Sequence, residues 1–261
     1  MSAPNGDSIE LLSTFELHEL VYWTLSLLNV PVGALERDDS AIAASYAVQK
    51  VGYYTAALGQ IEGRRRELGL QTRRELAEAE ERRADDPAEA ARLRQEALHT
   101  GDYEIQQHFF TVCAAQIGRL LRLAHRLVGM PFPPDAEAFF ASYQPLRNQF
   151  EHLNERLPSE ERGGRLVLDA PGRLLLGLND DGAGNITVRR AGVNVVAQVN
   201  ARGVAEAERL VARSLADIRA KCIEHLEQFF ADHPELAADA GWIQPMVVQR
   251  LREADGEYDQ K

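Results

Sequence analysis

The spacing of apolar residues predicts helices over most of the chain. Apolar side chains recur three to four positions apart over residues 8–29, 38–63 and 102–129. Pro31 ends the first of these segments, and one of residues 38–40 (Asp, Asp, Ser) caps the second. The face of the third segment expected to enter the core consists of Ile105, Phe109, Val112, Cys113, Ile117, Leu120, Leu121, Ala124 and Val128.

A charged segment separates the second and third of these helices. Over about residues 64–99, arginines alternate with acidic residues and large apolar side chains are few. This pattern favours solvent-exposed helices that carry ion pairs between successive turns. Asp85, Asp86 and Pro87 mark a cap, with a helix restarting near Ala88. We expect a solvated helical arm, and the alternative that its arginines bind phosphate is opposed by the interleaved carboxylates.

Prolines and glycines organise the second half of the chain. After three prolines, Asp135 is placed to cap the next helix, and Pro145 either interrupts that helix or starts another over residues 146–157. Short runs of Leu, Val and Ile with period two, separated by turn residues, predict a β-meander over residues 163–201. Helical spacing then returns over residues 204–233, with Phe229 among the apolar positions of this helix. A short helix at 242–252 and a polar tail follow.

These elements predict a mainly α fold, a helical bundle with a small antiparallel β-meander inserted before the C-terminal helix. We expect residues 1–160 to form the bundle, with the charged arm at about 64–99. Residues 163–201 form the meander, and residues 203–261 form C-terminal helices that pack on the bundle. A sheet this small is marginal alone, so one of its faces should pack on helices.

The composition of the chain limits which partners and which cellular compartment are expected. The net charge of −11 opposes nonspecific attraction to nucleic acid or anionic lipid, so a nucleic-acid site must be local. Residues 1–10 lack the basic and apolar regions of a secretory signal, so no export is expected. The most apolar run, residues 20–35, is too short for a membrane span. We therefore expect a cytoplasmic protein with no membrane partner.

Cys113 and Cys222 are expected to be buried and reduced, and a disulfide is the less favoured alternative.

Common catalytic signatures do not occur in the sequence. It contains no GxxxxGK[ST], GxGxxG, HExxH or GxSxG pattern. The seven histidines show no HxH or HxxxH spacing, so no metal site is expected. The acidic stretch at 179–185 lacks the terminal Glu of a calcium loop and is interpreted as a hairpin turn.

The stretch RNQFEH, residues 147–152, carries the clearest candidate chemistry. On a helix, Asn148 and His152 share nearly one face, whereas Arg147 lies about 140° around the axis from His152. Arg147 and His152 can therefore act on one substrate only at a helix edge, or where a second copy of the helix faces the first. The structural alternative is an ordinary helix in which Arg147 pairs with Glu151 at i,i+4 spacing.

Arg147, Asn148 and His152 resemble the R-x4-6-H motif of the HEPN superfamily, which carries a polar residue directly after the Arg. The resemblance covers about residues 100–160, and the motif lies late in a helical region, as in that family. It implies a helical bundle that forms a homodimer. In active members it implies a metal-independent endoribonuclease that uses the Arg and His of both copies. Toxins partnered with MNT nucleotidyltransferases carry Tyr two residues after the His, where this chain has Asn154.

The residue types suit that chemistry. RNA cleavage through the 2′-hydroxyl needs a base for its proton and a cation beside the phosphorane, for which His152 and Arg147 are candidates, with Asn148 assisting. No cofactor is implied. Arg119, Arg122 and Arg126 form a basic stripe at i, i+3 and i+7 that is the candidate RNA-binding surface, or else an ordinary exposed helix face.

A noncatalytic protein of the same descent is the alternative function. The meander and the charged arm lie outside the family's core pattern, which leaves open a helical protein that binds RNA or a protein partner without cleaving RNA. The sequence leaves both functions open.

Overall fold

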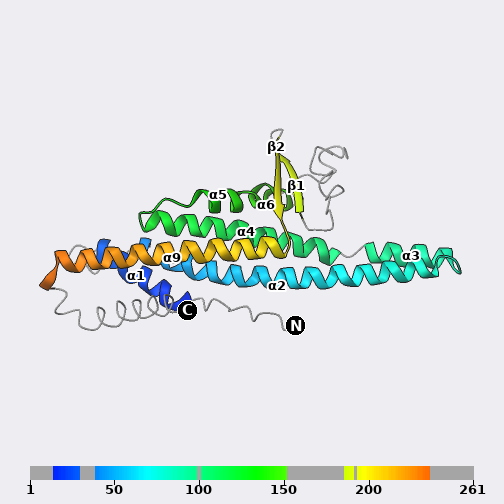
Figure 1. The fold of residues 1–261 in the computed structure, drawn as a ribbon, viewed down its shortest axis with the longest axis horizontal. Helices are drawn as coiled ribbons and strands as arrows, with labels where there is room; N and C mark the ends of the chain where they lie inside the picture. The colour runs from blue at the N-terminus through cyan, green and yellow to red at the C-terminus, as the bar shows by residue number, and fades with distance from the viewer. Residues whose placement is uncertain (1–13, 30–38, 99–100, 152–184, 191–192, 236–261) are drawn as a thin grey trace, which may run out of the picture. The chain divides into compact units, whose positions relative to one another are not determined.

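The computed structural model describes residues 14–29, 39–98, 101–151, 185–190 and 193–235 of the 261-residue chain. Most of them are helical, which confirms the mainly α fold (Figure 1). The helices are α1 (Thr14–Asn29), α2 (Asp39–Arg82), α3 (Pro87–Leu98), α4 (Gly101–Leu127), α5 (Pro134–Ala141), α6 (Tyr143–Glu151) and α9 (Ala201–Asp232). The strands are β1 (Asn185–Arg190) and β2 (Val193–Gln198). The expected short helix at 242–252 lies outside the described residues.

The chain forms two compact units, each assembled from separated segments. The first draws on residues 1–52, 120–133 and 211–261, and the second on residues 53–119 and 134–210. Helices α2, α4 and α9 therefore contribute residues to both units, whereas α5, α6 and the β-hairpin belong to the second.

The core of the first unit combines small and branched side chains from four helices. The first half of α2 contributes mostly alanine, and a helix face of alanines lets neighbouring helices approach closely. Cys222 lies in this core, and Cys113 is buried in the second unit; both are free, as expected. Burial raises the pKa of the Cys113 thiol to about 11 and that of Cys222 to about 12. Residues with little or no exposed surface include Leu20, Val21, Leu25, Ala41, Ala44, Ala47, Val48, Val51, Leu121, Ala124, Ile218 and Leu226.

Helix α2 is longer than the apolar pattern predicts. It spans 44 residues, so the predicted end near Gly63 is wrong. No atom lies within 4 Å of the place where a Cβ at Gly63 would stand, so this glycine weakens the helix without creating a packing defect. Ion pairs three and four residues apart, Arg64–Glu67 and Arg82–Glu78, support the helix beyond it.

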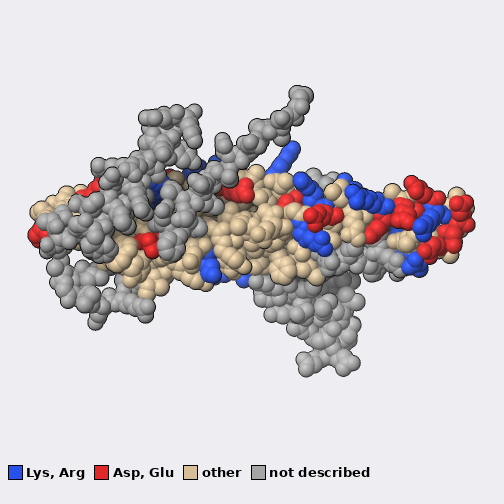
Figure 2. Space-filling model, turned by 90° about the horizontal axis from the view of Figure 1, so that it is seen from below, with Lys and Arg blue, Asp and Glu red and all other residues tan. Residues whose placement is uncertain are grey.

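The charged arm, which we define as residues 64–98, is helical and mostly exposed. Basic and acidic side chains interleave over it in Figure 2. The predicted cap and restart are confirmed, because α3 begins at Pro87 and the Asp86 carboxylate accepts a 3.0 Å hydrogen bond from the Glu89 backbone N–H.

Helix α4 occurs where it was predicted, but the face it buries at its N-terminal end differs from the prediction. Ile105 and Phe109 were expected in the core and are 48% and 51% exposed. Phe110 is fully buried instead. The prediction holds for Cys113, Ile117, Leu121, Ala124 and Val128, which are all buried, whereas Val112 and Leu120 are only half-buried. A similar one-residue shift occurs near the end of α9, where Phe230 rather than Phe229 is buried.

The end of α4 is a Schellman turn. Gly129 has φ +81°, the Gly129 N–H donates to the Arg126 carbonyl and the Met130 N–H donates to the His125 carbonyl. The buried His125 ring bonds through Nδ1 to the Pro131 carbonyl at 3.1 Å, and His225 of α9 bonds through Nε2 to the Val128 carbonyl at 3.2 Å. Two imidazoles thus bind the carbonyl groups of one turn.

Helices α5 and α6 follow the proline-rich turn. Helix α5 starts at Pro134, with Asp135 in its first turn rather than before it, and α6 starts at Tyr143. Pro145 therefore lies in the first turn of a new helix, which was one of the two expected positions. Figure 1 shows α5 and α6 along the Gly101–Arg119 part of α4. A Cβ on Gly118 of α4 would lie 2.4 Å from the Phe140 Cβ, so this glycine permits the close approach of α5.

Strands β1 and β2 form an antiparallel hairpin. Their register runs from Asn185 opposite Gln198 to Arg190 opposite Val193, which leaves residues 191–192 for the connection, where the sequence places a turn. Ile186 and Ala197, which are partners in this register, are both buried, while Val196 is exposed. One face of the hairpin is therefore covered. The earlier runs of the predicted meander lie outside the described residues.

Candidate functional site

Helix α6 carries the first part of the RNQFEH stretch. Arg147 and Asn148 are half-buried on it, whereas His152 lies one residue beyond the helix end and outside the described residues. The predicted helix over residues 146–157 is thus confirmed as far as Glu151. The predicted meeting of Arg147 and His152 across two copies stays a prediction.

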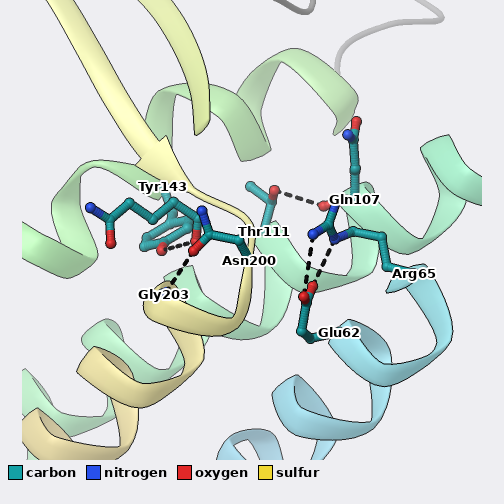
Figure 3. A network of polar contacts seen from close by, with 8 residues as sticks. Glu62, Arg65, Gln107, Thr111, Tyr143, Asn200 and Gly203 are labelled. Atoms are coloured by element: carbon teal, nitrogen blue, oxygen red, sulfur yellow. Dashed lines mark hydrogen bonds and ion pairs between the residues drawn. The ribbon is translucent and has the colours of Figure 1, made fainter. Parts of the chain in front are cut away.

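A fully buried tyrosine fixes the start of α6. The Tyr143 hydroxyl donates a 2.8 Å hydrogen bond to the Gln198 carbonyl at the end of β2 (Figure 3). Its ring centroid lies 6.1 Å from that of Phe110 on α4. Burial raises the pKa of the phenol well above its ordinary value, against the opposing effect of the bond to Gln198, so the hydroxyl stays protonated as a donor. Leu146 is also buried, and together these side chains hold one face of α6 against the rest of the second unit.

The Gln198 carbonyl also faces the start of α9. The Asn200 side-chain oxygen caps that helix by accepting a 2.9 Å bond from the Gly203 N–H. A Cβ on Gly203 would lie 1.9 Å from the Gln198 oxygen, so only glycine fits there without displacement of the backbone (Figure 3). The end of β2, the start of α6 and the start of α9 therefore meet at one backbone carbonyl.

The Asn148 side chain already has a partner on its own helix. Its oxygen accepts a 2.7 Å hydrogen bond from the Gln144 side-chain nitrogen, one turn earlier. That bond leaves the Asn148 amide nitrogen to donate elsewhere. The assistance of Asn148 to His152 stays a prediction, and it would come from this nitrogen rather than from the oxygen.

Gln107 of α4 is the most unusual polar residue of the second unit. Its side chain is fully buried, and among the residues that the structure describes neither Nε2 nor Oε1 has a hydrogen-bond partner. Leaving a buried polar group unpaired costs about 1–3 kcal/mol. The sequence analysis missed Gln107, because the face of α4 was aligned on Phe109 and not on Phe110. With the correct alignment, Gln107 is a polar residue three positions before the buried Phe110.

Glu62 and Arg65 form a bidentate ion pair on α2, also missed by the sequence analysis. Arg65 Nε lies 2.7 Å from one Glu62 oxygen and Nη2 lies 3.3 Å from the other (Figure 3). Only 11% and 10% of the two side chains are exposed, so the expectation of a fully solvated segment from residue 64 is wrong at Arg65. The mutual neutralisation of the two charges permits their burial.

The three arginines of the expected RNA-binding stripe are exposed on α4. The Arg122 guanidinium lies over the Phe132 ring, 5.7 Å from its centroid. This contact holds one arginine side chain against the surface. Exposure suits both interpretations of Arg119, Arg122 and Arg126, a phosphate-binding surface and an ordinary solvated face.

The described ranges contain neither a cluster of metal-ligating side chains nor a helix suited to cross a membrane. There, no group of three or more His, Cys, Asp or Glu side chains is placed to hold a metal ion. No helix in the same ranges has the length and apolar character that crossing a membrane requires.

No family model, curated protein or solved structure matches the chain.

Proposed function

We propose that the protein is a HEPN-like, metal-independent endoribonuclease that acts as a homodimer in the cytoplasm through Arg147 and His152. The observation that carries the proposal is the orientation of α6. Tyr143 and Leu146 bury one face of the helix, whereas Arg147 and Asn148 are half-buried and retain contact with solvent. A short helix anchored in this way can present a cation at a fixed position.

The homodimer follows from helix geometry. Arg147 and His152 would lie about 140° apart on a helix continued through residue 152, so a site containing both is completed by a second copy of the same segment. The net charge of −11 makes such a site a local one, since the rest of the surface repels RNA.

The proposed reaction is transesterification at an RNA phosphate. The His152 imidazole takes the proton of the 2′-hydroxyl, the 2′-oxygen attacks phosphorus, and the bond to the 5′-oxygen breaks. Arg147 stabilises the charge on the phosphorane, and the protonated imidazole of the second copy returns a proton to the 5′-oxygen. The products are a 2′,3′-cyclic phosphate and a 5′-hydroxyl.

The second candidate is a noncatalytic protein that binds RNA or a protein partner. The bond between Gln144 and Asn148 favours it, because that bond uses a polar atom of the motif within the helix itself. The two candidates differ in whether bound RNA is cleaved.

Cleavage of single-stranded RNA in EDTA is the deciding experiment. We expect the purified protein to produce 2′,3′-cyclic phosphate ends and to leave DNA intact. His152→Ala and Arg147→Ala should each reduce the rate by about 100-fold or more, with circular dichroism unchanged. Arg74→Ala, a change at an exposed arginine of the charged arm, is the matched control and should cleave normally. Binding without cleavage would select the noncatalytic candidate.

Two further measurements test the RNA surface and the dimer. Changing Arg119, Arg122 and Arg126 together to Gln should weaken RNA binding and flatten its dependence on salt, because fewer counterions are released. Unchanged affinity and slope would place the RNA elsewhere.

Sedimentation should give a dimer, and a strict monomer at tens of micromolar would remove the composite site.

A further inference from the structure

The chain from α5 into α6 runs antiparallel to α4 within the second unit, as one contact of each helix with α4 indicates. Gly118 of α4 lies against Phe140 of α5. Phe110, eight residues earlier on α4, lies against Tyr143 of α6, which is three residues later in the chain than Phe140. Moving back along α4 from Phe110 therefore corresponds to moving forward along α6 from Tyr143.

This direction predicts that Gln107 lies opposite Arg147. Gln107 is three residues before Phe110 and shares its face of α4, and Arg147 is four residues after Tyr143 and shares its face of α6. At about 1.5 Å per residue, the two steps differ by only about 1.5 Å along the helices. In Figure 3 the Gln107 amide points away from Glu62, which agrees with its lack of a bond to that carboxylate.

From this placement we infer that Gln107 is a positioning residue for Arg147. Its amide oxygen accepts a hydrogen bond from the Arg147 guanidinium when RNA occupies the site, and so aims the cation at the phosphate. Arg147 already has an interaction partner in this structure, so the bond belongs to the RNA-bound state. The inference rests on the proposed role of Arg147. It gives a function to a buried amide that finds no partner among the described residues.

Two substitutions of Gln107 separate this role from a structural one. Methionine matches the unbranched shape of glutamine without its polar atoms, and glutamate keeps the shape and the acceptor oxygen. If the amide only fills space, methionine is the better replacement, because it buries no polar group. If the amide positions Arg147, glutamate is the better replacement, because a carboxylate accepts from a guanidinium. The two roles therefore predict opposite orders.

The experiment compares RNA cleavage by the wild type, Gln107→Met, Gln107→Glu and Thr111→Val, together with thermal stability. Thr111 is the matched control, because it is buried one turn away and its hydroxyl bonds to its own helix at the Gln107 carbonyl. We expect Gln107→Met to unfold at the same or a higher temperature, yet to lose about tenfold in kcat with KM nearly unchanged. Gln107→Glu and Thr111→Val should stay within about threefold of the wild type.

Several outcomes would overturn the inference. A Gln107→Met protein that handles RNA like the wild type would mean that the amide is satisfied by internal water alone and has no role. A loss in Gln107→Glu as large as in Gln107→Met would also reject the acceptor role, and if the Glu variant does not fold, Gln107→Met alone decides. If the wild type binds RNA without cleaving it, affinity replaces kcat as the readout and only the catalytic proposal fails. A wild type that binds no RNA would end both proposals.

Discussion

The two ends of α4 bury polar side chains in different ways. Near its N-terminal end the Gln107 amide is fully buried with no partner among the described residues. Near its C-terminal end the His125 ring is equally buried and its Nε2 also has no partner among the described residues, but Nδ1 bonds to the Pro131 carbonyl and the ring contacts Phe132 edge-on, with centroids 5.4 Å apart. The difference separates a polar group that stabilises the fold from one that the fold merely tolerates. Substitutions should therefore affect stability strongly at His125 and little at Gln107.

The largest expected effect on stability is that of His125→Ala. This change removes the bond to the Pro131 carbonyl and leaves a cavity beside Phe132, so the free energy of unfolding should fall by about 2–4 kcal/mol. Urea denaturation measures it. Gln107→Met is the control and should lower stability by less than about 0.5 kcal/mol or raise it. Equal losses at both positions would show that the two ends do not differ.

The pH dependence of stability should also distinguish the two ends. Burial lowers the pKa of His125, while the Pro131 bond and the Asp217 carboxylate oppose that shift. The unfolded chain therefore binds a proton more readily than the folded one. The stabilisation of the folded state by the neutral His125 ring is complete above the unfolded pKa of about 6.5 and is lost as the pH falls below it. Urea midpoints between pH 7.5 and 5 should decline in the wild type. They should decline less in His125→Gln, whereas Gln107→Met should follow the wild type.

Gly129→Ala should have a smaller effect at the same end of α4. No atom obstructs a Cβ there, but φ of +81° is unfavourable for alanine, so the cost should be about 1 kcal/mol. Gly63→Ala, in the middle of α2, is the matched control and should stabilise the protein by a similar amount. Thermal unfolding of the two variants should shift in opposite directions. A stabilising Gly129→Ala would contradict the role given to the turn.

Thr111→Val should have the smallest effect. The hydroxyl bonds to a carbonyl of its own helix, and valine keeps the branched shape, so the loss should stay below about 1 kcal/mol. Urea denaturation beside Gln107→Met would show whether the buried polar groups near Gln107 contribute to stability at all. A loss as large as that of His125→Ala would mean that they do.

Apolar spacing predicts the helices well where every turn buries a side chain. It predicts the wrong helix end where ion pairs between successive turns stabilise the helix instead. The predicted stripe of α4 holds from Cys113 to Val128 except at Leu120, because each turn there buries a side chain. The end of α2 was placed at Gly63 since glycine and the loss of apolar residues normally end a helix, yet ion pairs extend it.

The candidate site was predictable only where its residues lie close in sequence. The motif residues Arg147 and Asn148 could be recognised by their spacing alone, and the structure places them on a helix. Gln107 and the Tyr143 bond to Gln198 join positions that are far apart in the chain. No local pattern specifies which of two adjacent phenylalanines faces the core, and that choice decides whether Gln107 is buried.

The Gln198 carbonyl offers a way to disturb α6 from a distance. It accepts the Tyr143 hydroxyl bond and leaves no room for a Cβ on Gly203. A methyl group added at position 203 must push this carbonyl aside, and the displaced oxygen is the one that holds the first residue of α6. Gly203→Ala would therefore change the tilt of α6 from a distance, while every residue of the RNQFEH motif keeps its own side chain.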